Sequence, residues 1–255
     1  MNAIEFQDVT KTYLISKGKY GLLTDTIGEK LRGFLKKKIN NENNIVALRN
    51  VSFEIKRGES VGIIGRNGAG KTTILKLISQ ITFPNSGKIK VDGKIGAFIE
   101  LGAGLHPELT GRENIYLYGA ILGMKKKEIE TKFNQIVDFA EIKKFLDLPI
   151  KKYSSGMYSR LGFAVCAFSD PDILLVDEVL AVGDVNFQQK CLVKMNDFKK
   201  ENRTIVFISH NMDAIRSTCD RVIYLENGKL TKTGRTGDVV NYYLKRAQET
   251  YSSTI

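Results

Sequence analysis

The sequence predicts an α/β fold in which a parallel-sheet core carries a small antiparallel β subdomain and an inserted α-helical subdomain. Continuous apolar runs at residues 61–64, 173–176 and 204–209 are typical of strands that are buried on both faces of a parallel sheet. Segments with helical apolar spacing separate these runs along the chain. The N-terminal region instead alternates apolar and polar residues, which is typical of half-buried antiparallel strands.

The antiparallel subdomain is predicted from the first 64 residues. Residues 4–15 alternate apolar and polar side chains, and residues 45–64 contain three further strand-like runs that lead into the core. A segment at about 16–44 separates these two regions. Its leucine, isoleucine and phenylalanine residues recur at helical spacing, and lysine and arginine residues surround them. We therefore expect a basic amphipathic insertion between the first two strands.

The remaining elements alternate between strands and helices, which indicates a parallel sheet with helical crossovers. In chain order we expect a hairpin flank at 87–93, a strand at 95–100, helical structure from 111 to about 152, a helix at 157–168, a strand at 173–176, a helix near 187–201, a strand at 204–209, an edge strand at 222–225, a turn at 226–229 and a terminal helix at about 239–246. The helical stretch is predicted to form an inserted subdomain at about 101–165. A chain of 255 residues, 42% of them hydrophobic, can bury one large core, so we predict one domain over 1–247 and a frayed tail over 248–255.

Composition excludes several classes of protein. No stretch approaches the roughly 20 apolar residues of a membrane span, and the N-terminus lacks the features of a signal peptide, so we expect a cytoplasmic protein. Cys166, Cys191 and Cys219 match no metal or redox spacing, and only two histidines occur, so we expect buried, reduced thiols and no metal cluster. The formal net charge of +11 fits a nucleic-acid binder, a membrane-surface protein or a protein that handles an anionic substrate.

A phosphate-binding loop joins the first core strand to a helix. Gly65, Gly70, Lys71 and Thr72 fill the fixed positions of the pattern G-x-x-x-x-G-K-[ST], between an apolar run and a segment with helical spacing. Glycines let the backbone bring its N–H groups to phosphate oxygens, and the start of the helix adds positive charge. Lys71 can reach the β- and γ-phosphates, and the Thr72 hydroxyl can ligate Mg²⁺. The nucleotide-binding residues expected here are Arg66, Asn67, Gly68, Ala69, Gly70, Lys71, Thr72 and Thr73.

Three further polar residues follow buried strands at the edge where ligands bind in open α/β sheets. Asp177 and Glu178 come directly after the run at 173–176. Beside a phosphate loop, we expect Asp177 to hold Mg²⁺ and Glu178 to act as the general base for the attacking water. His210 follows the strand at 204–209, where a histidine can donate a hydrogen bond to a γ-phosphate. The candidate catalytic residues are therefore Lys71, Glu178 and His210.

The order and spacing of these motifs resemble the ATPase domain of ABC transporters. The resemblance covers residues 4 to about 244 and includes two further segments, Tyr-Ser-Ser-Gly-Met at 153–157 and Ala-Val-Gly-Asp at 181–184. It implies a P-loop NTPase (RecA-like) core that hydrolyses ATP with Mg²⁺. It also implies a head-to-tail homodimer that traps two nucleotides, each between one subunit's phosphate loop and the other subunit's signature segment.

The resemblance assigns roles to residues outside the phosphate loop. Tyr13 stands where the family has an aromatic residue that stacks on adenine, although a strand-edge aromatic can equally pack on the small sheet. Glu100 replaces the usual glutamine that senses Mg²⁺ and couples to the permease, so it keeps an oxygen ligand but loses a donor. Asp184 belongs to the loop that communicates between the two sites.

The signature segment also departs from the usual L-S-G-G-Q of the family. Ser154, Ser155 and Gly156 replace its serine-glycine-glycine core, and a serine hydroxyl with a glycine backbone can still present donors to a γ-phosphate. This signature, the run at 100–114 and the run at 178–184 look like the ATPases of exporters for O-antigen, teichoic acid and capsular polysaccharides. In that subfamily the ATPase pairs with a separate membrane permease. Some members add a C-terminal carbohydrate-binding domain, for which we expect this chain to be too short.

The resemblance therefore predicts a homodimeric ATPase at the cytoplasmic face of the membrane, bound to two permease subunits that export a lipid-linked polysaccharide. For the basic insertion two interpretations stay open: a solvated face, or a contact with the inner leaflet or with the pyrophosphate-linked end of the substrate. Alternative functions are the export of drugs or lipids, a soluble ATPase acting on nucleic acid, and a regulatory module without turnover. No nucleic-acid partner is expected, because family members of that kind usually join two ATPase domains, and each motif occurs here once.

Overall fold

The computed structural model describes residues 1–14, 44–98, 104–177 and 183–252. Most of the predicted basic insertion, residues 16–43, lies outside the described residues. Glu100 and Glu178, two of the predicted site residues, also lie outside them.

Two sheets form the body of the molecule, as predicted. The first is antiparallel with the order β2-β1-β4, built from β1 (Asn2–Leu14), β2 (Asn44–Lys56) and β4 (Ser86–Val91). The prediction of three strands within 45–64 is wrong, because β2 is one continuous strand that is followed by β3 (Ser60–Ile64). Asp8 and Asn50 adopt a positive φ, and the β1–β2 register shifts on both sides of the Val9–Val51 pair. These irregularities break the alternating pattern without ending the strand.

The second sheet has the order β5-β6-β7-β3-β8-β9 and is parallel except for its last strand. Its other strands are β5 (Ile95–Phe98), β6 (Ile173–Val176), β7 (Thr204–Ile208), β8 (Arg221–Glu226) and β9 (Lys229–Arg235). The predicted edge strand at 222–225 is an interior strand, because β9 pairs with it and forms the edge. The mostly polar sequence of β9 gave no strand signal. The predicted hairpin flank at 87–93 is also wrong, since β4 pairs with β1 and β5 pairs with β6.

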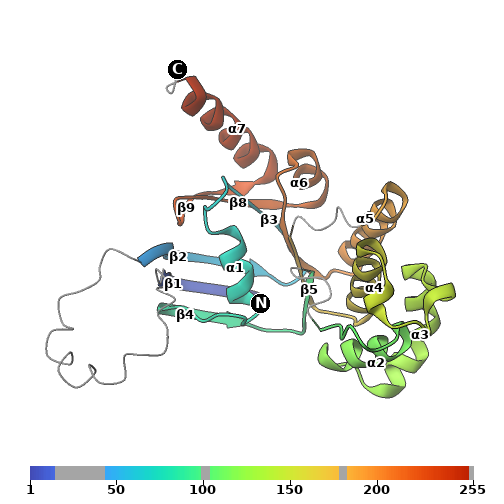
Figure 1. Cartoon of the computed structure of the whole chain (residues 1–255). Coiled ribbons are helices and arrows are strands. Elements are labelled where there is room, and N and C mark those ends of the chain that lie inside the picture. Colours follow the sequence, from blue (N-terminus) through green and yellow to red (C-terminus); the bar gives the residue numbers. More distant parts are fainter. Residues whose placement is uncertain (15–43, 99–103, 178–182, 253–255) are drawn as a thin grey trace, which may run out of the picture.

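Helices cover both faces of this sheet. Helix α1 (Lys71–Ile78) packs into a core between the two sheets, through Ile74, Leu75, Leu77 and Ile78. On the opposite face, a second core includes residues of α5 (Val185–Lys200), α6 (Met212–Thr218) and α7 (Thr236–Ser252). Helix α7 is longer than the expected 239–246 and continues into the predicted tail, and it leads away from the body in Figure 1. Cys166, Cys191 and Cys219 are buried free thiols, as predicted.

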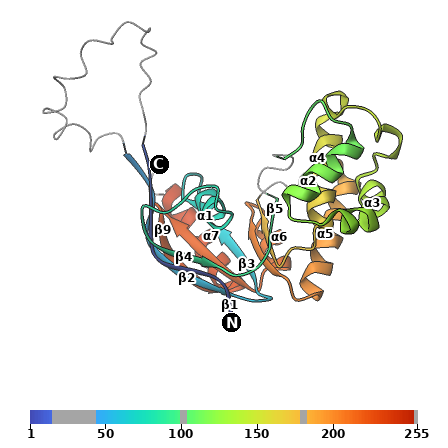
Figure 2. The ribbon, with the colours of Figure 1, turned by 90° about the horizontal axis from the view of Figure 1, so that it is seen from below.

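The inserted helical region has a hydrophobic core of its own. It comprises α2 (Gly111–Ile121), α3 (Lys126–Ala140), two 3₁₀ turns (Lys143–Phe145 and Ile150–Lys152) and α4 (Ser155–Phe168). Figures 1 and 2 both show these helices gathered on one side, away from the antiparallel sheet. Helix α4 also contributes Phe163 and Cys166 to the core of the large sheet, so it anchors the region to the body. Within the described part of the chain, no helix is long and apolar enough to cross a membrane.

Candidate nucleotide-binding site

The phosphate loop follows β3, whose five residues are all buried, and it ends where α1 begins at Lys71. Two of its glycines are required by the backbone. Gly65 has φ +154°, and a Cβ placed there would lie 2.3 Å from the carbonyl oxygen of Leu225. Gly70 has φ +102°, and its Cβ would lie 2.6 Å from the carbonyl oxygen of Ala47. Because only glycine fits both the conformation and the space, the sequence fixes the path of this loop.

Lys71 is nearly buried, with 7% of its surface exposed. Its ammonium group donates hydrogen bonds to the carbonyl oxygens of Gly65 at 2.8 Å and Arg66 at 3.1 Å. A buried cation is stable only where such acceptors surround it. The loop therefore surrounds the ammonium group of Lys71, which lies next to the backbone N–H groups at the start of α1. This positive charge and these donors together are suited to binding phosphate oxygens.

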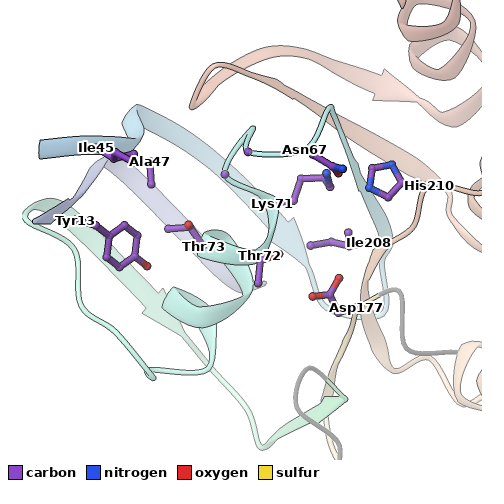
Figure 3. Close-up of a pocket in the computed structure, with 12 residues that line it drawn as sticks. Tyr13, Ile45, Ala47, Asn67, Lys71, Thr72, Thr73, Asp177, Ile208 and His210 are labelled. Carbon is purple, nitrogen blue, oxygen red and sulfur yellow. The ribbon is translucent and has the colours of Figure 1, made fainter. Parts of the chain in front are cut away.

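A cavity of about 620 Å³ opens beside the loop, at the carboxyl edge of the parallel sheet. Figure 3 shows Tyr13, Ile45 and Ala47 at one end and Asn67, Lys71, Asp177 and His210 at the other, with Thr72 and Thr73 between them. The described residues that line the cavity are Tyr13, Ile45, Ala47, Asn67, Gly68, Gly70, Lys71, Thr72, Thr73, Asp177, Ile208 and His210. The structure thus brings nine predicted site residues together.

The two ends of this cavity differ in chemistry. The Asp177 carboxylate and the Thr72 hydroxyl are oxygen ligands of the type that Mg²⁺ prefers, and they line the same cavity as Lys71. At the other end, Tyr13 pairs with Ile45 across the β1–β2 ladder, and 38% of its surface is exposed. The ammonium group of Lys11 lies 5.0 Å from the centroid of the Tyr13 ring. A cavity with a cationic end and an aromatic end fits a nucleotide whose phosphates lie in the loop and whose base lies beside Tyr13.

Some predicted residues lie beside the cavity and not in its wall. Arg66 and Ala69 belong to the loop but do not line the cavity, and Ala69 is buried. Ile45, Ala47 and Ile208 do line it, although the sequence did not single them out. Their position follows from pairing between strands, since Ile45 is the ladder partner of Tyr13 and Ile208 precedes Ser209 and His210 at the end of β7.

The signature segment, residues 154–156, lies elsewhere on the molecule. Ser154 caps α4, and its hydroxyl accepts a hydrogen bond from the backbone N–H of Met157 at 3.2 Å. Of the described residues that line the cavity, none comes from this segment. One chain therefore contains a phosphate loop and a signature segment that do not share a single pocket.

Asp184 caps α5 on the same side as the signature segment. Its carboxylate accepts hydrogen bonds from the Phe187 N–H at 2.9 Å and from the Arg160 guanidinium at 2.8 Å. The backbone hydrogen bond from Phe187, with help from the charge of Arg160, holds the pKa of Asp184 below its usual range despite an opposing effect of burial. Asp184 is therefore ionised at neutral pH and tied to the start of its helix.

Comparison with known proteins assigns the chain to a family. The family model described as ABC transporter matches residues 48–181, which include the phosphate loop, the signature segment and Asp177. The chain belongs to the ABC transporter family. It matches the nucleotide-binding part of such transporters, so this ABC protein is an ATPase.

Relatives of this ABC ATPase match it over nearly the whole chain. The O-antigen export system ATP-binding protein RfbB of Klebsiella pneumoniae is 43% identical over 240 residues, which cover 94% of this chain and 96% of the relative. The teichoic acids export ATP-binding protein TagH of Bacillus cereus is 44% identical over 242 residues, which cover 94% of this chain and 42% of that longer protein.

Solved structures support the same fold. A bacterial ABC transporter cassette whose structure is dimeric superimposes with a TM-score of 0.71 at 25% identity, covering 91% of this chain and 98% of the other. An ATP-binding subunit of an ABC transporter superimposes with a TM-score of 0.74 at 22% identity, covering 98% of both chains. The predicted α/β architecture with a P-loop NTPase core is therefore confirmed.

Proposed function

We propose that this ABC ATPase powers the export of a lipid-linked polysaccharide, of the O-antigen, teichoic acid or capsular type, across the cytoplasmic membrane. The proposal is supported by relatives named for O-antigen and teichoic acid export, which match 94% of the chain at 43% and 44% identity. The single observation that carries the ATPase chemistry is the cavity that joins Lys71, Thr72, Asp177 and His210.

The site residues have distinct roles in this proposal. The loop N–H groups and Lys71 bind the β- and γ-phosphates of ATP, while Thr72, Asp177 and Glu100 would hold Mg²⁺, which would neutralise charge that develops on the phosphates. Glu178 accepts the proton of the attacking water, and His210 donates a hydrogen bond to the γ-phosphate. Tyr13 stacks on the base. The assignments of Lys71, Thr72, Asp177, His210 and Tyr13 are supported by the cavity, where cationic and oxygen-bearing groups lie opposite an aromatic ring.

The active form in this proposal is a head-to-tail homodimer. The phosphate loop and the signature segment of one chain do not line a common cavity, so a second copy has to supply Ser154, Ser155 and Gly156 to each bound nucleotide. A related cassette has been solved as a dimer. Asp184, which caps α5 beside the signature segment, would then face the same interface and link the two sites.

The proposed transporter contains two copies of this subunit and two copies of an integral-membrane permease. The subunit lies at the cytoplasmic face of the membrane and is held there by the permease. Closure of the dimer around ATP drives the permease, and hydrolysis reopens the dimer. The relatives that are export-system ATP-binding proteins support a permease partner.

The ATPase mechanism is tested with Glu178→Gln. This variant should bind ATP and form a stable dimer, yet hydrolyse ATP at least about 100-fold more slowly, because an amide cannot accept the proton of the attacking water. Dimerisation is measured by gel filtration with and without MgATP, and hydrolysis by phosphate release. A hydrolysis rate near that of the wild type would overturn the assignment of the base, and a monomer with bound ATP would overturn the dimer.

The transport step is tested in cells that are depleted of this protein. A lipid-linked polysaccharide should accumulate on the cytoplasmic side of the membrane and should be exported again when the wild-type gene, but not the Glu178→Gln gene, is restored. Normal surface polysaccharide after depletion, combined with loss of export of a drug or a lipid, would favour an exporter of another class.

A further inference from the structure

We infer that Arg160 is a positioning residue that fixes the signature segment and Asp184 to one another, so that both reach the partner subunit's nucleotide as one rigid unit. This inference rests on the proposed homodimer and adds to it a residue that none of the motifs assigns. Arg160 lies on α4, the helix that begins at Ser155, and only 17% of its side chain is exposed.

The Arg160 guanidinium contacts groups on three sides. One terminal nitrogen donates to the Glu141 carboxylate at 2.8 Å, and the other donates to the Asp184 carboxylate, also at 2.8 Å. The central carbon of the guanidinium lies 5.0 Å from the centroid of the Phe187 ring. A planar, delocalised cation can satisfy two carboxylates and an aromatic face at the same time, whereas a lysine ammonium presents one compact charge. The site is therefore built for an arginine.

The two carboxylates belong to different parts of the fold. Glu141 follows α3 directly and has φ +59°, a left-handed conformation that costs free energy for a non-glycine residue. It also forms an ion pair with Lys190 on α5. Glu141, Arg160, Asp184 and Lys190, called the Arg160 cluster below, thus join α3 and α4 of the helical region to the beginning of α5 in the body. Two positive and two negative charges balance within it.

Gly156 of the signature segment also lies beside Gly183, the residue that precedes Asp184. A Cβ added at Gly156 would be 4.0 Å from the Cα of Gly183. Gly183 has φ +74°, and a Cβ there would lie 3.1 Å from the Nε of Arg160. Gly156 therefore lies close to Gly183, and the Arg160 side chain packs directly on Gly183, where a larger residue would be strained. Any movement of α4 that carries Arg160 must also carry Asp184, or break the ion pair between Arg160 and Asp184.

This connection has a consequence for the proposed dimer. The partner's nucleotide would meet the signature segment and the loop that ends at Asp184 from the same subunit. If Arg160 holds the signature segment and Asp184 together, a movement of the helical region displaces both at once. The distance between them is then fixed before the dimer closes. Loss of that spacing should slow hydrolysis in the closed dimer but leave ATP binding by the separate phosphate loop unchanged, because the cavity contains no residue of the Arg160 cluster among those described.

The test uses Arg160→Gln and Arg160→Lys, with Arg112→Gln as the matched control. Arg112 also lies in the helical region, forms an ion pair with Asp147 at 2.9 Å and has its guanidinium 5.3 Å from an aromatic centroid, that of Phe133, but it does not contact Asp184. We expect both Arg160 variants to lower kcat at least about 10-fold, since misplacing a group by about 1 Å can cost about 100-fold. The Kd of the isolated subunit for MgATP should stay within about 2-fold, as should both constants of Arg112→Gln.

A purely structural role is separated from a positioning role by two further measurements. Arg160→Lys keeps the charge and most of the packing, so it should retain a Tm close to that of Arg112→Gln while kcat falls. In a double-mutant cycle, Arg160→Gln combined with Asp184→Asn should be no slower than the slower single variant, because both changes break the same link. Additive losses, or a kcat for both Arg160 variants that matches Arg112→Gln, would overturn the inference.

Failure of the proposed function gives a different result. If Glu178→Gln alone does not dimerise with MgATP, the homodimer is wrong. If Glu178→Gln dimerises and addition of Arg160→Gln neither weakens that dimer nor changes turnover in the Glu178 wild-type background, the homodimer stands and the role of Arg160 is wrong.

Discussion

The phosphate-loop side and the signature side of this molecule are built by different physical means. On the phosphate-loop side, buried strands, two glycines that no other residue can replace, and a nearly buried lysine shape a cavity whose wall comes from β1, β2, α1 and the ends of β6 and β7. On the signature side, short polar segments cap two exposed helix starts, and ion pairs hold them together. One side is a pocket, and the other is a surface.

In the proposed homodimer, this difference would explain why one subunit binds a nucleotide and a second subunit completes the site for hydrolysis. A cavity organised by backbone geometry and burial needs no partner to keep its shape. The exposed helix starts of the signature side would contact a nucleotide only when the partner subunit presents one in its phosphate loop. Variants on the two sides should therefore fail in different ways, the first in binding and the second in turnover.

The largest effect is expected for Lys71→Ala, which removes the cation of the phosphate loop. Truncating one member of a buried charge contact costs about 2 to 5 kcal/mol, so the Kd for MgATP should rise about 30- to 5,000-fold. Isothermal titration or a fluorescent nucleotide measures the change. Lys88→Ala, which removes an exposed lysine of β4 outside the cavity, is the control and should bind normally. An unchanged Kd for MgATP in Lys71→Ala would contradict the expectation that changes on the phosphate-loop side impair nucleotide binding.

A smaller effect, confined to turnover, is expected for Ser154→Ala. The change removes a hydroxyl that we expect at the partner's γ-phosphate, so kcat should fall about 100-fold while the Kd of the isolated subunit stays constant. It also removes the cap of α4, at a cost of about 1 kcal/mol in stability.

Thr110→Ala separates the two consequences of the Ser154 change. Thr110 caps α2 and takes part in a capping box with Glu113, so its loss costs stability at a helix start of the same region without touching the signature segment. Equal losses of turnover in the Ser154 and Thr110 variants would show that the serine acts through stability alone.

The phosphate-loop side was also easier to predict from the sequence than the signature side. The loop, Asp177 and His210 follow from local patterns, because a buried strand, a glycine pattern and a polar residue at a strand end are all visible within a few positions. Ile45 and Ala47 were missed because they reach the cavity through pairing with β1, some thirty residues away in the chain. The Arg160 cluster was missed for the same reason, since its ion pairs join residues 19, 24 and 49 positions apart.

The strand β9 shows the limit for the fold. Its sequence, Lys-Leu-Thr-Lys-Thr-Gly-Arg, has no apolar run, and it forms because the buried β8 beside it offers backbone hydrogen-bonding groups. The edge of the sheet is therefore β9, one strand beyond the predicted edge strand, β8. Burial patterns predict interior strands well and polar edge strands poorly, because an edge strand can expose one face and one side.

The smallest effect is expected at the base end of the cavity, for Tyr13→Ala. Stacking on a base contributes about 1 to 3 kcal/mol, so the Kd for MgATP should rise about 10-fold, while kcat at saturating ATP stays constant. Tyr13→Phe keeps the ring, and it should bind as the wild type does because stacking does not require the hydroxyl. If Tyr13 only packs on the small sheet, Tyr13→Ala will lower the Tm without changing the Kd. Since 38% of Tyr13 is exposed and its ring faces the cavity beside Ile45 and Ala47, we expect the change in Kd. That result would extend the phosphate-loop side of the molecule to the antiparallel sheet, with the whole nucleotide bound by one subunit.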